Sequence, residues 1–204
     1  MKKIIIIGII TILLIIILPE HKYNNEDFNI KTYISNIDKD NDNIDDQTDI
    51  LNNAKKYVQT KPKYKSKYYG TGYPNDEYGV CTDVVGFALK DAGYDLMTLV
   101  NEDIKLHKER YNIKIIDKNI DFRRVNNLNI YFKYNSISLT LDPKEISSWQ
   151  GGDIVVFKRH IGIVSDKRNS KGISYVIHHA NPFQINYEED ILEINEIIGH
   201  YRIS

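Results

Sequence analysis

The sequence predicts an α+β domain in which N-terminal helices pack on a C-terminal antiparallel sheet. Apolar residues recur at helical spacing from residue 47 to about residue 107. After residue 150 the pattern changes to short apolar runs separated by turn residues, which is typical of strands joined by hairpins. About 185 residues follow the apolar N-terminus, which is enough for one domain with its own core.

Residues 1–19 predict an export signal. Lys2 and Lys3 precede an apolar run at residues 4–18, and Pro19 ends it. The order of a basic and then an apolar region is typical of such signals, and the run is shorter than the roughly 20 residues that span a bilayer. No small-residue cleavage site follows. We favour a signal anchor over a cleaved signal peptide, and either one places the remaining chain outside the cytoplasm.

Residues 20–46 are acidic and rich in Asn, with eight acids, three bases and no apolar period. We therefore expect a solvated tether there and a folded domain at residues 47–204. The net charge of the whole chain is −1, which does not favour a nucleic-acid partner. We expect a monomer.

Three helices are predicted in the first half of the domain. The first runs from residue 47 to Thr60, ahead of Pro62. A loop rich in Gly, Asn and Asp separates it from the second helix, which begins at or just after Cys81 and stops at Gly93. A third helix is expected at residues 96–107.

The second half predicts strands. A possible strand lies at residues 129–133, and the apolar runs that follow predict strands at residues 154–157, 160–166, 174–180 and 194–203. Turn residues at 149–153 and 167–172 separate the central runs, so neighbouring strands should be antiparallel.

Cys81 is the single cysteine of the chain, so an intramolecular disulfide is excluded. Its predicted position at a helix start faces free backbone N–H groups and the positive end of the helix dipole. Both lower the pKa of a thiol. We therefore interpret Cys81 as a nucleophile rather than as a small apolar core residue.

Three histidines could serve this nucleophile. His160 opens one predicted strand, and His178 and His179 end the next. Ends of adjacent antiparallel strands can lie side by side. Because side chains alternate between faces, only one of His178 and His179 can share a face with His160. A cysteine, a base and a third group that orients the base would form a triad.

The order of these motifs resembles the NlpC-type cell-wall peptidases, which have a papain-like fold. It is closer still to a bacterial family named domain of unknown function 1287. The resemblance covers roughly residues 47–204 and rests on seven stretches, GYP (72–74), GVCTDVV (79–85), NIDFRRVNNL (119–128), GGDIVVF (151–157), HIGIVSD (160–166), VIH (176–178) and IIGHYR (197–202).

The resemblance implies a role for each matching residue. Cys81 would be the nucleophile, His160 the general base, and His178 the group that orients His160. The family usually has Asn at the next position, where this chain has His179, so His179 remains the alternative third member. Tyr73 and the N–H of Cys81 would hold the oxyanion.

Two further residues are candidates for substrate binding. Asp83 caps the second helix or binds a substrate amine, and we favour the cap. Arg123 grips a peptide carboxylate or forms a structural salt bridge, for example with Asp121. His200 is expected to be structural. Thiolate–imidazole chemistry implies no metal and no organic cofactor.

The leading functional hypothesis is an exported cysteine amidase or peptidase of the cell envelope that hydrolyses amide bonds of peptidoglycan peptides. Its other expected partner is the membrane, through the N-terminal segment. The alternatives are a non-catalytic cell-wall binding module on the same fold and an acyl- or transpeptidyl-transferase that uses the same thioester.

Overall fold

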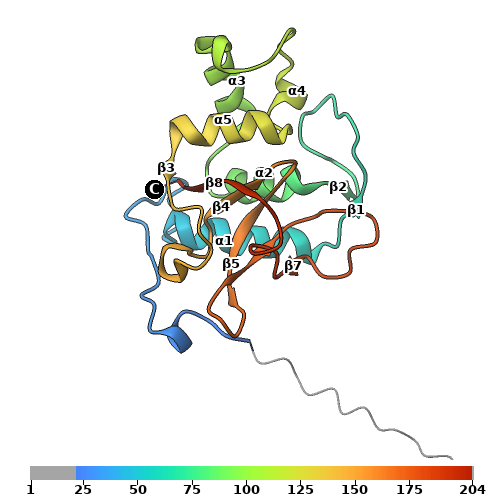
Figure 1. The fold of residues 1–204 in the computed structure, drawn as a ribbon. Coiled ribbons are helices and arrows are strands. Elements are labelled where there is room, and N and C mark those ends of the chain that lie inside the picture. Colours follow the sequence, from blue (N-terminus) through green and yellow to red (C-terminus); the bar gives the residue numbers. More distant parts are fainter. Residues whose placement is uncertain (1–21, 204) are drawn as a thin grey trace, which may run out of the picture.

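A computed structural model describes residues 22–203 (Figure 1). The expected signal segment at residues 1–19 lies outside the described residues. The helices are α1 (Asp46–Gln59), α2 (Cys81–Asp91), α3 (Leu96–Leu106), α4 (Lys118–Asp121) and α5 (Val125–Asn135), with 3₁₀ turns at Glu26–Phe28, Lys108–Arg110 and Ile146–Ser148. Within residues 22–203, no helix has both the length and the apolar character needed to cross a membrane.

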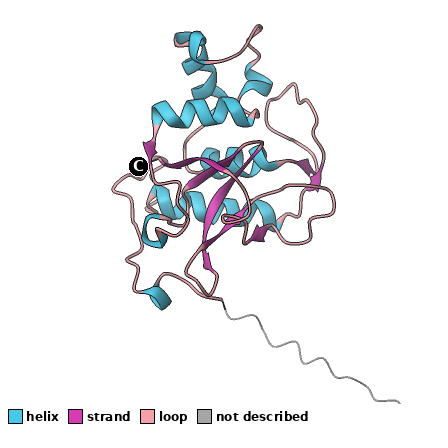
Figure 2. Ribbon diagram, viewed as in Figure 1, coloured by secondary structure: helices cyan, strands magenta, loops and turns pink. Residues whose placement is uncertain are grey.

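The strands form one antiparallel sheet and one small parallel pair (Figure 2). The sheet has the order β3-β8-β4-β5-β6-β7, and the small pair joins β1 to β2. Their bounds are β1 (Lys63–Tyr64), β2 (Tyr78–Gly79), β3 (Ile137–Ser138), β4 (Ile154–Phe157), β5 (His160–Arg168), β6 (Ser174–Ile177), β7 (Glu188–Glu189) and β8 (Ile197–Arg202). The prediction of an α+β domain with helices first and an antiparallel sheet afterwards is confirmed.

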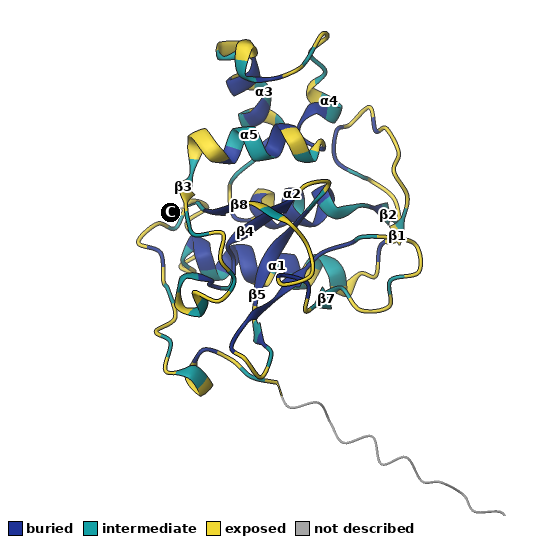
Figure 3. Cartoon of the chain, viewed as in Figure 1, coloured by how far each residue is buried: buried dark blue, intermediate teal, exposed yellow. Residues whose placement is uncertain are grey.

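Both faces of the sheet are covered, which explains why all four residues of β4 are buried (Figure 3). One face packs against α1 and α2 and contributes Ile154, Val156, Ile161, Ile163 and Ile177 to the main core. The other face carries a smaller cluster around Trp149, under the loops before β4 and after β7. The central strands are thus fixed on both sides, and the ends of β5 and β6 are held in place.

The prediction of a strand at residues 129–133 is wrong, because these residues lie inside α5. Ile130, Tyr131 and Phe132 are residue types common in strands. The buried positions Leu128 and Phe132 are nevertheless four apart, which is the spacing of one helix face. Burial of that helix face therefore outweighs the strand preference of these residue types.

Residues 22–45 also differ from the expected solvated tether. Asn25 is buried and accepts a hydrogen bond at 2.7 Å from the guanidinium of Arg168, and it donates to the side chain of Gln150 at 3.1 Å. Tyr23 forms an antiparallel bridge with Arg168. The segment therefore lies along the domain, as the blue trace of Figure 1 shows.

Candidate active site

Cys81 is the first residue of α2, as the sequence predicts. Val80 has an extended backbone, and its N–H donates to the Asp83 carboxylate at 2.8 Å, which caps the helix. Because α2 packs on β5, the Cys81 sulfur also lies against the backbone N–H of Ile161, the residue directly after His160. The thiol thus sits where a helix start meets a strand start.

The expectation that Cys81 has a lowered pKa is wrong for this structure. Burial of the thiol is the largest effect and raises its pKa to about 11. The N–H groups of Ile161, Thr82 and Cys81 itself act in the opposite direction, and the charge of Asp83 adds to the rise. The resting group is a neutral thiol, so a base must remove its proton.

His160 and His178 form a pair, and His160 directly precedes Ile161, whose N–H lies against the Cys81 sulfur. Nε2 of His160 lies 2.9 Å from Nδ1 of His178, and the ring planes are nearly perpendicular. His160 is half-buried at the start of β5, whereas His178 is buried directly after β6. In the described part of the chain, no hydrogen bond joins the Cys81 sulfur to either ring.

Strand register explains why His178, rather than His179, meets His160. Ile163 pairs with Ile177, so the next position outward sets Gly162 opposite His178. A Cβ at Gly162 would lie 3.2 Å from the Cβ of His178 and 2.8 Å from the carbonyl oxygen of Ile177. The missing side chain lets His178 lie over Gly162 and reach the ring of His160.

Glu189 extends the pair into a chain of three groups. Its carboxylate lies 3.0 Å from Nε2 of His178. A carboxylate only accepts hydrogen bonds, so Nε2 of a neutral His178 carries the proton and its Nδ1 accepts from Nε2 of His160. Nδ1 of His160 is then left with its lone pair free. The chain of hydrogen bonds prepares His160 as a base.

Burial keeps both imidazoles neutral. Desolvation, followed by the charge of His179, lowers the pKa of His160 to about 4. Desolvation and the neighbouring histidines lower the pKa of His178 to about 3. At neutral pH the site therefore holds a neutral thiol, two neutral imidazoles and a carboxylate.

The expectation that strand alternation turns His179 away from the Cys81 side is wrong, because His179 packs beside Tyr64, which lies close to Cys81. It is buried, and its ring packs edge-on against Tyr64 of β1 at a centroid distance of 5.2 Å. Burial raises the pKa of Tyr64, and a charge on Cys81 adds to this rise because the two side chains are close. Nδ1 of His179 has no hydrogen-bond partner among the described residues.

Tyr73 does not hold an oxyanion in this structure. Its ring is buried against Phe87 and Phe122, and its hydroxyl donates to Asp95, the cap of α3, at 2.9 Å. Tyr64 is the tyrosine beside the thiol. In the sequence, Tyr64 belongs only to a basic, tyrosine-rich stretch at residues 61–69, a composition that is typical of a solvated loop.

Arg123 forms a buried ion pair with Asp83, which is the structural role and not the substrate-binding one. Its Nε and Nη2 donate to the two carboxylate oxygens of Asp83 at 2.7 and 2.8 Å, and both side chains are almost fully buried. Nη1 also donates to the carbonyl oxygen of Lys67. Arg123 therefore ties the loop before Cys81 and the start of α2 to the segment between α4 and α5.

Two other sequence motifs meet away from this site. The buried carboxylate of Asp153 accepts hydrogen bonds from Nε and Nη2 of Arg202. It also lies 3.0 Å from Nε2 of His200. The ring of His200 stacks on Trp149 at 3.7 Å. His200 is structural, as expected, because it joins β8 to the turn before β4.

The fold and the site define an α+β protein with a cysteine and an imidazole pair where a helix meets a sheet. The family described as domain of unknown function (DUF1287) matches residues 51–203, and the chain belongs to this family. Uncharacterized protein YijF of Escherichia coli (strain K12) is 34% identical over 166 residues, which cover 75% of this chain and 80% of that protein. No solved structure matches.

Proposed function

We propose that this protein is a cysteine amidase or peptidase of papain-like, NlpC type that hydrolyses amide bonds in cell-envelope peptides. The observation that carries the proposal is the hydrogen-bonded chain from Glu189 through His178 to His160, whose next residue, Ile161, has its N–H against the Cys81 sulfur at the start of α2. Cys81 and His160 are both partly exposed residues, which supports the proposal. Peptidoglycan is the proposed substrate because the N-terminal segment predicts export.

The proposed reaction begins with a neutral pair. Nδ1 of His160 takes the proton of the Cys81 thiol as the sulfur attacks the carbonyl carbon of the amide. The tetrahedral oxyanion collapses, the C–N bond breaks, and the imidazolium returns the proton to the leaving amine. Water, activated by the same imidazole, then attacks the thioester and frees the acid and the thiol.

His178 and Glu189 support the charged intermediate. When His160 becomes an imidazolium, its Nε2–H donates to Nδ1 of His178, whose own Nε2–H donates to the Glu189 carboxylate. Charge-assisted hydrogen bonds are stronger than neutral ones. These hydrogen bonds therefore stabilise the state in which Cys81 is a thiolate and His160 is an imidazolium. The backbone N–H groups at the start of α2 are the available oxyanion donors.

The test is turnover of purified muropeptides, read by mass spectrometry of the products. The wild-type protein should release new amine and acid ends, and Cys81→Ser should not. His107→Ala is a matched control because His107 is a partly exposed histidine outside the site. Addition of an amine acceptor separates hydrolysis from transfer, because a transferase yields the acceptor amide.

A second candidate function is a non-catalytic binding module on the same fold. The raised pKa of Cys81 favours it, because a thiol buried beside an acid is slow to ionise. Saturable muropeptide binding without any cleavage, unchanged in Cys81→Ser, would support the module and reject the enzyme.

A further inference from the structure

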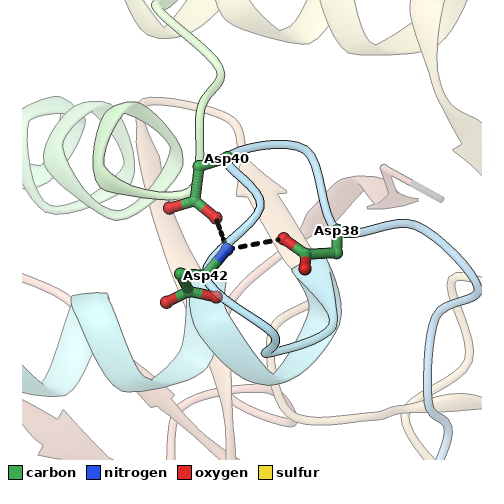
Figure 4. Close-up of side chains that lie close together, drawn as sticks. All are labelled: Asp38, Asp40 and Asp42. Carbon is green, nitrogen blue, oxygen red and sulfur yellow. Dashed lines mark hydrogen bonds between the residues drawn. The ribbon is translucent and has the colours of Figure 1, made fainter.

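An acidic loop precedes α1, outside the residues that the family matches. Residues 38–49 read DKDNDNIDDQTD, and most of them belong to the segment whose composition predicts a solvated tether. In the structure, carboxylate oxygens of Asp38, Asp40 and Asp42 lie within 4.8 Å of one another (Figure 4). Three like charges so close repel one another unless a cation offsets them.

The spacing of this loop follows that of 12-residue calcium loops. Such loops place acidic ligands at positions 1, 3, 5 and 12 and a sharp turn at position 6. If Asp38 is position 1, then Asp40 is position 3, Asp42 is position 5 and Asp49 is position 12. The sixth residue, Asn43, has a φ of 73°, the left-handed conformation that this position needs.

Asp49 supplies an independent sign of a ligand. Its side chain lies in the first turn of α1 and is only 6% exposed, and its Oδ2 has no hydrogen-bond partner among the described residues. Asp42 and Asp40 lie close enough for their charges to act on this carboxyl. A buried carboxylate oxygen without a donor is costly, and a cation would satisfy it.

The other acids of the loop are already used by the fold. Asp45 caps α1 by accepting from Thr48, and Asp46 accepts from the N–H of Lys39 and the hydroxyl of Tyr94. These contacts hold the loop against α1 and the turn between α2 and α3. Within the described residues, the carboxylates of Asp38, Asp40 and Asp42 accept only from backbone N–H groups of the loop itself, which leaves each of them lone pairs with which to bind a cation.

We propose that residues 38–49 bind one Ca²⁺ ion, with the carboxylates of Asp38, Asp40, Asp42 and Asp49 as ligands. In loops of this kind the seventh residue, here Ile44, adds its backbone carbonyl oxygen. Many oxygen ligands on a flexible loop suit Ca²⁺ better than Mg²⁺, which requires a near-ideal octahedron. Asp49 is shorter than the usual Glu at this position, so the affinity should be moderate, with a Kd of about 10⁻⁵ to 10⁻³ M.

The experiment uses the full-length, chelator-treated protein and titrates it with Ca²⁺ in a calorimeter. Tb³⁺ serves as a second probe, because Tyr94 beside the loop can sensitise its luminescence. One ion should bind per chain, and Asp40→Asn and Asp49→Asn should each weaken binding at least about tenfold. Glu196→Gln removes one exposed charge elsewhere and should bind Ca²⁺ like the wild type.

Thermal unfolding distinguishes a variant that has lost a Ca²⁺ ligand from a variant that no longer folds. Asp49→Asn keeps the shape of the side chain and removes a buried like charge, so it should be at least as stable as the wild type without Ca²⁺. Ca²⁺ should raise the Tm of the wild type and leave that of Asp49→Asn unchanged. No saturable binding up to millimolar Ca²⁺, or an Asp49→Asn protein that binds like the wild type, would overturn the proposal.

Discussion

At the scale of single residues, the site is defined by neutral groups held by burial. Of the three N–H groups around the Cys81 sulfur, those of Cys81 and Thr82 are the ones that the helix-start argument anticipates, and that of Ile161 is added by the strand. Desolvation is larger than their combined effect. The position of the cysteine was thus predictable from the sequence, whereas its pKa depended on how deeply α2 packs against β5.

The first prediction concerns the reactivity of Cys81. Because its pKa is raised to about 11, the thiolate fraction at pH 8 is small, and alkylation should accelerate about tenfold per pH unit up to that pKa. Intact mass after iodoacetamide treatment measures it, since the chain has one cysteine. A free cysteine peptide, whose rate levels off near pH 8.5, is the reference. A plateau below pH 9 in the protein would contradict the buried neutral thiol.

The second prediction separates His178 from His179. His178→Ala removes the acceptor of His160 and should lower kcat by about 10²-fold or more. His178→Gln should retain part of the rate, because its amide can accept from His160 and donate to Glu189. His179→Ala lies outside this chain of hydrogen bonds, so kcat should fall less than about tenfold while the Tm falls, because a buried ring is lost. A dead His179→Ala enzyme beside an active His178→Ala enzyme would assign the third role to His179.

At the scale of elements, the close approach of β5 and β6 makes the histidine pair. We predict that Gly162→Ala destabilises the protein by about 1–3 kcal/mol and disrupts the pair, because the new Cβ would meet Val176 at 2.6 Å and Ile177 at 2.8 Å. Gly70→Ala is the matched control, because no atom lies within 4 Å of its Cβ. Denaturant unfolding of both variants measures the difference. Equal stability would show that β6 can shift without cost.

Helical periodicity and hairpin spacing located α1, α2, α3 and the central strands from the sequence, because local patterns specify them. Glu189 could not be found in this way, because its strand has two residues and its place beside His178 depends on a long connection. Asn25 was missed for the same reason, since its partner Arg168 is 143 positions away. Tyr73 was misassigned because a shared motif does not reveal where its hydroxyl points.

At the scale of the whole molecule, the buried imidazoles should make stability depend on pH. The pKa of His178 is about 3 in the folded state and about 6.5 when unfolded, so the unfolded chain binds more protons between these values. Stability contributed by the neutral ring is complete above pH 6.5 and is lost as the pH falls toward 3.

We therefore predict that the free energy of unfolding falls between pH 7 and pH 4.5, with His178 contributing on the order of 2 kcal/mol. His178→Gln cannot titrate and should show a correspondingly smaller fall. Urea unfolding of the two proteins at both pH values provides the comparison. Identical pH dependence in the two would mean that His178 is not buried as a neutral ring.

The most direct measurement of the central claim is the detection of an acyl group on Cys81 during turnover of muropeptides. Rapid acid quenching followed by peptide mass spectrometry should find the thioester on Cys81 in the wild-type protein. His160→Ala should form it at least about 10²-fold more slowly, and His107→Ala should form it at the wild-type rate. Cleavage of the substrate that persists in Cys81→Ala, or that proceeds without any acyl-Cys81, would contradict the account.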